Sequence, residues 1–305
     1  MDRETTAPRG QGVALAALFG GAIAIATAPL FVKVSEAGPV ATAFWRVFLA
    51  LPFLWVWALT GRSRAAPATA AARRREGWLM LGAGAFFAGD LAVWHWSIVL
   101  TSVANATLLA NLAPIFVTLA AWWLFSTRPT SIFLAGLTAS LVGVALLIGA
   151  DFQLSGSALI GDALGVVTAV FYAAYQLTVA RLRASAGTAR IMAQSSTVMA
   201  AILLPLATVS AEPFLPQTGT GWALLFGLAL IAQVAGQSLI AYAFAHLPAT
   251  FSSVGLLLQP VAAALFAWVL LGETLAALQI GGGLLVLAGI RIAHQAGRRA
   301  WPSAP

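Results

Sequence analysis

The chain has 305 residues, of which 61% are hydrophobic and 8% are charged, whereas soluble domains carry about 25% charged residues. No aqueous fold hides so much apolar surface, so the composition excludes a soluble protein and predicts a membrane protein. The net charge of +7 does not predict nucleic-acid binding, because most arginines lie in short gaps between apolar runs. The absence of cysteine excludes disulfides, thiolate catalysis and cysteine metal sites.

Ten apolar runs recur along the chain, each near the roughly 20 residues that a helix needs to cross the hydrocarbon layer. They cover residues 11–33, 39–60, 77–100, 103–125, 131–150, 158–181, 189–210, 219–245, 249–271 and 275–294. The connections are short except for 61–76, an Ala- and Arg-rich segment that we expect to be a loop. The predicted fold class is therefore all-α, a polytopic membrane protein with ten transmembrane helices and cytoplasmic tails at 1–10 and 296–305.

The first run resembles a secretory signal in one respect. It contains Ala26-Thr27-Ala28, which is similar to a signal-peptidase site. The run is long for the apolar part of a signal peptide, and nine further spans follow it. We therefore expect a retained first transmembrane helix.

Positive charge divides sharply between the two predicted faces. One face collects fourteen arginines and the other holds only Lys33. The fourteen are Arg3, Arg9, Arg62, Arg64, Arg73, Arg74, Arg75, Arg128, Arg181, Arg183, Arg190, Arg291, Arg298 and Arg299. Because cytoplasmic loops retain positive charge, both termini are expected in the cytoplasm. A wrong number of spans would have mixed the two faces, so the asymmetry also supports ten.

The chain carries an internal repeat. A shift of 146 residues aligns Pro114, Trp122, Gly136 and Gly143 with Pro260, Trp268, Gly282 and Gly289. Two halves of five helices follow, at 11–150 and 151–295. Because five is odd, the second half begins on the opposite side of the membrane, so the repeats are inverted. Inverted repeats are typical of transporters, in which two similar halves open one central site alternately to each side.

Several local patterns resemble a known family. They are Phe44-Trp45-Arg46-Val47-Phe48 in the second span, Thr101-Ser102-Val103-Ala104-Asn105-Ala106 leading to Pro114, and Leu271-Gly272-Glu273 after the ninth span. With the ten spans and two halves, they resemble the drug/metabolite transporter superfamily, within it the EamA-type exporters, and more loosely the YddG-type exporters of aromatic and other amino acids. The resemblance implies metabolite export across the bacterial inner membrane, with substrates that range over amino acids, drugs, nucleotides and sugars.

Asp90 in the third span is the sharpest candidate for a site, because ionisable side chains at membrane depth are rare. Trp94 shares its helical face at i, i+4, and His95 follows. Asp90 could attract a substrate ammonium or take up a proton, while Trp94 offers an aromatic surface and His95 could relay protons. The alternatives are that Asp90 caps a neighbouring broken helix or bonds a partner polar group, and that His95 only forms a hydrogen bond between helices.

The fourth and ninth spans carry matching signals for helix breaks. Asn105, Asn111 and Pro114 lie in the fourth span, and Gln259 and Pro260 occupy the equivalent place in the ninth. Proline removes a backbone donor and disrupts the hydrogen-bond ladder, so both helices should bend or break at matching depth. Such breaks often mark the substrate site or a gate, and a purely structural kink is the alternative.

Four further polar or charged candidates lie in the spans, and Glu273 lies between the ninth and tenth spans. Gln233 and Gln237, one turn apart, either line a cavity or bond helices together, and Gln176 in the sixth span offers the same choice. Arg46 is expected to form a structural ion pair. Glu273 is expected to cap the tenth helix, because an acidic residue suits a helix start.

The residues together predict a secondary transporter that exports small metabolites, with amino acids, including aromatic ones, as the expected class. A proton-coupled multidrug exporter is the alternative, and an intramembrane enzyme is a remote one, for which Ser97 near His95 is the only candidate pair. No ATP-binding loop is present. His95, His246 and His294 lack ligand spacing, so no metal or cofactor is expected. The expected partners are a small-molecule substrate and membrane lipid, with no nucleic acid, and the protein is expected to be a monomer.

Overall fold

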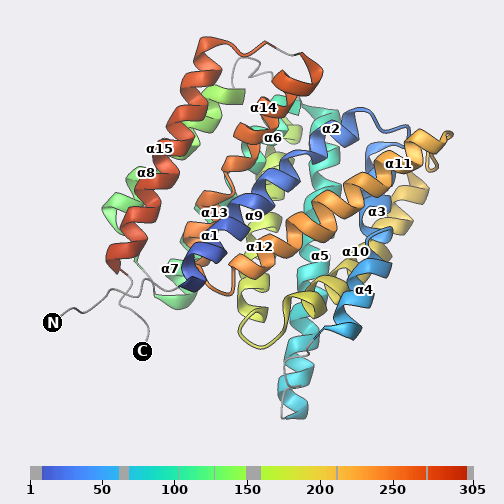
Figure 1. The fold of residues 1–305 in the computed structure, drawn as a ribbon, viewed down its shortest axis with the longest axis horizontal. Helices are drawn as coiled ribbons and strands as arrows, with labels where there is room; N and C mark the ends of the chain where they lie inside the picture. Colours follow the sequence, from blue (N-terminus) through green and yellow to red (C-terminus); the bar gives the residue numbers. More distant parts are fainter. Residues whose placement is uncertain are drawn as a thin grey trace.

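The computed structural model describes residues 9–61, 69–101, 103–126, 128–148, 159–210, 212–272 and 274–300. Every secondary-structure element within these ranges is a helix, and the helices form one bundle (Figure 1). Ten helical segments in the described ranges are long and apolar enough to cross a membrane. The predicted all-α fold with ten spans is confirmed.

Five spans are single helices: α5 (Ala70–Leu100), α8 (Ser131–Ile148), α9 (Leu159–Leu182), α10 (Thr188–Val209) and α15 (Ala277–Ala300). The other five change direction or helix type: α1 (Arg9–Ala26) with α2 (Ala28–Lys33), α3 (Pro39–Phe48) with α4 (Leu51–Thr60), α6 (Val103–Ala110) with α7 (Ala113–Phe125), α11 (Gly219–Leu228) with the π-helical η3 (Ala229–Gln237) and α12 (Ser238–Ala243), and α13 (Ala249–Gly255) with α14 (Leu258–Leu271).

The expected loop at 61–76 is wrong in its second part, because α5 begins at Ala70 rather than at residue 77. The Thr69 hydroxyl accepts a hydrogen bond from the backbone N–H of Ala72 at 3.2 Å and caps the helix. The Ala and Arg residues that follow are strong helix formers, so the helix extends into the charged segment. The first turns of α5 consequently project beyond the bundle (Figure 1).

The fourth and ninth spans are broken where the prolines predict. Pro114 lies at the start of α7 and Pro260 at the start of α14. Near the start of a helix, the missing N–H of proline has no intrahelical acceptor to lose and its fixed φ suits the helix. The breaks themselves fall at Asn111–Leu112 and Leu256–Leu257, within one residue of matching positions in the two halves.

The last helices of the two halves, α8 and α15, pack closely side by side (Figure 1). A Cβ atom on Gly143 would lie 2.6 Å from the carbonyl oxygen of Gly282, and one on Gly136 would lie 2.7 Å from that of Gly289. Only glycine permits such an approach of two backbones. These are the glycines that the repeat aligns, and the contacts pair them crosswise between the halves.

Two acidic side chains join the loop before α3 to the loop before α11. Glu36 accepts hydrogen bonds from the Thr218 hydroxyl and from the backbone N–H groups of Gln217 and Thr218, at 2.7 and 3.0 Å for the backbone pair. Glu212 in turn accepts from the backbone N–H of Val40 at 3.2 Å. The Thr218 hydroxyl and the two N–H groups lower the pKa of Glu36 below its ordinary value. Glu36, before α3, thus caps the start of α11, and Glu212, before α11, caps the start of α3. These two contacts tie α3 to α11.

Candidate functional site

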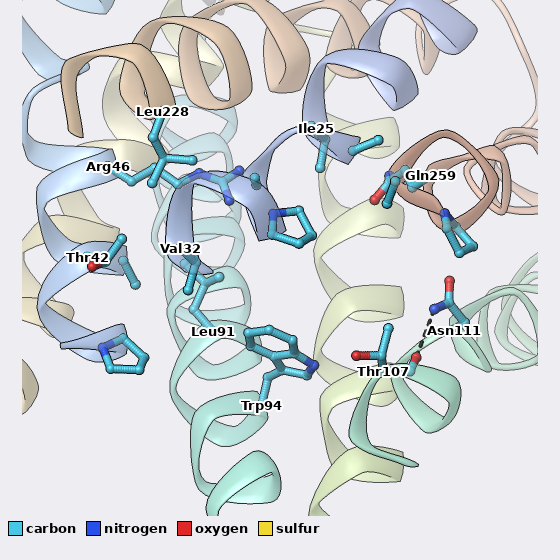
Figure 2. A pocket seen from close by; sticks show the side chains of 17 residues that line it. Ile25, Val32, Thr42, Arg46, Leu91, Trp94, Thr107, Asn111, Leu228 and Gln259 are labelled. Carbon is cyan, nitrogen blue, oxygen red and sulfur yellow. Dashed lines mark hydrogen bonds between the residues drawn. The ribbon is translucent and has the colours of Figure 1, made fainter. Parts of the chain in front are cut away.

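A central cavity lies among helices of both halves (Figure 2). It consists of two adjoining spaces of about 210 and 170 Å³. The residues that line both spaces are Ile25, Arg46, Leu91, Trp94, Asn111 and Gln259. Because α1, α3, α5 and both helix breaks contribute to the wall, the cavity lies where the two halves meet.

The cavity lies well inside the membrane-length helices, away from their ends. Arg46 is eight residues into α3 and Asp90 ten residues before the end of α5, so both lie about 10–15 Å from those helix ends at a rise of about 1.5 Å per residue. The wall continues to Val32 and Pro39, beside the loop at 34–38. In the other half of the bundle, nearer the termini, Leu182 and Met192 are fully buried in the core.

The cavity is charged by one residue of each sign. Arg46 is the only basic and Asp90 the only acidic side chain among the described lining residues. Both border the smaller space, but these two described side chains form no ion pair within 4 Å. The Asp90 carboxylate makes no hydrogen bond within the described part of the chain, so it is available to a ligand.

Arg46 is held from the second half of the protein. Its Nε donates to Gln233 Oε1 at 3.2 Å, and Gln233 Nε2 donates to Ser196 Oγ at 3.2 Å. The guanidinium carbon lies 5.9 Å from the centre of the Phe87 ring, within range of a cation–π interaction. The ion pair expected for Arg46 is therefore absent within 4 Å among the described residues, and an amide takes its place.

Gln233 and Gln237 both lie in η3, a stretch of π-helix of the kind often found at functional sites. Gln237 lines the smaller space and accepts a hydrogen bond from the Tyr175 hydroxyl at 3.3 Å. The Tyr175 ring stacks on Phe87 with 4.6 Å between the ring centres. Both glutamines therefore form hydrogen bonds between helices, and Gln237 also lines the cavity, so each of the two predicted roles is found.

Six predicted site residues line the cavity: Asp90, Trp94, Asn111, Gln237, Gln259 and Pro260. In Figure 2, Arg46, Trp94 and Gln259 point towards the cavity from three different helices. Asn111 lies in the break before α7, where its Nδ2 donates to the Thr107 carbonyl oxygen at 2.8 Å. The side chain thereby occupies one of the carbonyl groups near the break.

Three other predicted site residues lie outside the cavity wall. Asn105 is buried and donates from Nδ2 to Asp162 Oδ1 at 3.1 Å, which joins α6 to α9. Gln176 is buried outside the cavity wall, and Pro114 does not line it. The side chain of His95 and all of Glu273 lie outside the described part of the chain.

Hydropathy and spacing missed Thr42, Thr107 and Arg46 as lining residues. The threonines carry little signal, because threonine is common in membrane helices. Arg46 could have been found, since an arginine eight residues inside a predicted span is a default site candidate by the same reasoning that selected Asp90. The π-helical form of η3 has no recognisable sequence signal.

Comparisons with known proteins agree with this architecture. The model of the EamA-like transporter family matches the chain twice, over residues 12–149 and 159–293. An uncharacterized transporter of Archaeoglobus fulgidus is 28% identical over 269 residues, which cover 86% of this chain and 90% of that protein. The pseudopaline exporter CntI of Pseudomonas aeruginosa strain UCBPP-PA14 is 28% identical over 210 residues, which cover 68% and 72%. A solved crystal structure matches 96% of this chain and 100% of its own with a TM-score of 0.80 at 18% identity, a likeness that shows the fold alone.

Proposed function

The chain belongs to the EamA-like transporter family, and we propose that it is a secondary transporter that exports small metabolites by alternating access through the central cavity. We expect its substrates to be amino acids, including aromatic ones, and its location to be the bacterial inner membrane with both termini in the cytoplasm. A relative named as the exporter of one compound supports export as the direction. The lack of an ATP-binding loop supports secondary transport.

The observation that carries the proposal is the cavity at the meeting point of the inverted halves. It lies at both helix breaks and reaches towards one side, while the other side is packed. Asp90 offers a carboxylate without a hydrogen-bond partner in the described chain, which suits a substrate ammonium. Trp94 offers an aromatic face to an apolar side chain.

Uptake of a labelled amino-acid panel into proteoliposomes tests the proposal. We expect saturable uptake that Asp90→Asn abolishes and Trp94→Ala weakens by roughly tenfold or more. Trp96→Ala is the matched control, because Trp96 lies on the same helix but is 52% exposed and does not line the cavity. Unchanged uptake by Asp90→Asn, with the protein folded, would contradict the role of Asp90.

A proton-coupled multidrug exporter is the second candidate, because the same Asp90 could hold a proton and a lipophilic cation in turn. Uptake that depends steeply on an imposed pH gradient, together with transport of lipophilic cations in place of amino acids, would favour it. Indifference to the gradient would favour a facilitator. An intramembrane enzyme receives no support, since Ser97 donates its hydroxyl to the Gly161 carbonyl oxygen at 2.7 Å and the relatives are transporters.

A further inference from the structure

We propose that Arg46 binds a carboxylate of the substrate, that Gln233 positions its guanidinium group for this contact, and that the transported compounds are therefore zwitterions with a carboxylate at Arg46 and an ammonium at Asp90. The inference rests on the proposed transport function and adds the chemical class of the substrate. It assigns a binding role to a residue whose local sequence predicted only an ion pair.

The first step is the burial of an unpaired charge. Arg46 is 7% exposed, and its Nη2 atom has no hydrogen-bond partner in the described part of the chain. A buried charge is costly unless an opposite charge or several hydrogen bonds compensate it. The Gln233 amide satisfies only Nε. Because Arg46 lines both spaces of the cavity, a ligand there adjoins the guanidinium, whose Nη2 atom is buried at the wall.

The second step is the fixed geometry of the group. Gln233 bonds Arg46 through its oxygen and Ser196 through its nitrogen, so helices α10 and η3 together orient the amide. Met199 Sδ lies 3.8 Å from the same nitrogen. Phe87 packs against the guanidinium from α5. A guanidinium held at Nε leaves its terminal nitrogens for a planar partner, and a carboxylate matches that fork with two parallel hydrogen bonds.

The third step is the balance of charge. A cation without a carboxylate would be attracted by Asp90 but repelled by Arg46. A simple anion would be attracted by Arg46 but repelled by Asp90. A zwitterion gains from both residues. With one basic and one acidic side chain among the described lining residues, the cavity is complementary to a compound of no net charge that carries both groups.

The test compares binding of phenylalanine, its amide and phenylpropionate to the purified protein in nanodiscs by calorimetry. We expect the wild type to bind phenylalanine roughly tenfold or more tightly than the amide, which lacks the carboxylate charge. Arg46→Gln should remove this preference and raise the affinity for the amide, a cation that no longer meets the repulsion of Arg46. Arg46→Lys keeps the charge but loses the fork, so it should retain part of the preference. Arg291→Gln, which changes an exposed arginine of α15, is the control and should behave as the wild type.

Gln233→Met tests the positioning role, because it keeps the length of the side chain but removes the acceptor for Nε. We expect it to lower the preference for phenylalanine over the amide and to leave amide binding unchanged, which a merely structural role would not do. Equal weakening of both ligands by Arg46→Gln or Arg46→Lys would overturn the inference. Binding only of compounds without a carboxylate would overturn it while the export function stands, and binding of none of the three would overturn both the inference and the amino-acid class.

Discussion

Replacing Gly143 with alanine probes the close contact between α8 and α15. The new Cβ atom would lie 2.6 Å from two backbone atoms, the Gly282 carbonyl oxygen and the Val286 nitrogen. Backbone atoms cannot rotate away as a side chain can, so the helices must separate. Overpacking of this kind costs about 1–3 kcal/mol, whereas alanine is favoured over glycine within a helix by about 0.5–1 kcal/mol.

Gly281→Ala is the matched control, because a Cβ atom there would meet nothing within 4 Å. Both variants gain the same helix propensity, so the difference between their free energies of unfolding isolates the packing cost, which we expect to be about 1–3 kcal/mol. Thermal unfolding in detergent, followed by the fluorescence of the eleven tryptophans, measures it as a lower midpoint for Gly143→Ala. A Gly143→Ala protein as stable as Gly281→Ala would refute the close crossing.

Three further predictions concern contacts away from the cavity. The pKa of Glu36 is lowered in the folded protein below its ordinary value of 4.5. The Glu36 carboxylate therefore stabilises the fold at pH values above 4.5, and this stabilisation is lost as the pH falls through the lowered pKa. The thermal midpoint of the wild type should consequently fall more steeply on acidification than that of Glu36→Gln. Arg190→Gln removes the partner of Glu76, which is 4% exposed and 3.0 Å from Arg190 Nη1. This should destabilise the protein by about 1–3 kcal/mol, whereas Arg181→Gln at an exposed site should have little effect in the same unfolding assay. Ser97→Ala removes a buried hydrogen bond to Gly161 and should cost about 1 kcal/mol while transport in proteoliposomes continues, and loss of transport with the protein intact would contradict a structural role for Ser97.

The features that sequence predicted well are those with a local cause. A proline lacks a backbone N–H whatever its surroundings, so Pro114 and Pro260 predicted the helix breaks without any knowledge of tertiary contacts. The apolar length of each span is likewise a property of the span itself. Asp90 was predicted as a site residue because an ionisable side chain is rare in a membrane helix, and Trp94 because it shares the same helical face. Neither prediction required knowledge of the surrounding helices.

The features that sequence missed depend on contacts between distant segments. Arg46 and Gln233 are 187 positions apart, and Gln233 and Ser196 are 37 apart, so no window of sequence contains the group. Asn105 and Asn111 look equivalent in the fourth span, but the partner of Asn105 is Asp162 on α9, 57 positions away. The break before α7 gives Asn111 a different direction, and only Asn111 lines the cavity.

The repeat explains the scaffold but not the distribution of charge within it. The shift of 146 that aligns the glycines of α8 and α15 places Met192 opposite Arg46 and Gly236 opposite Asp90, so both charges come from the first half. The second half contributes amides, Gln237 and Gln259 to the wall and Gln233 to Arg46. Because α3 and η3 belong to different halves, the hydrogen bond between Arg46 and Gln233 crosses from one to the other. Any rearrangement that separates α3 from η3 breaks it, so the orientation of the guanidinium depends on how the halves are arranged.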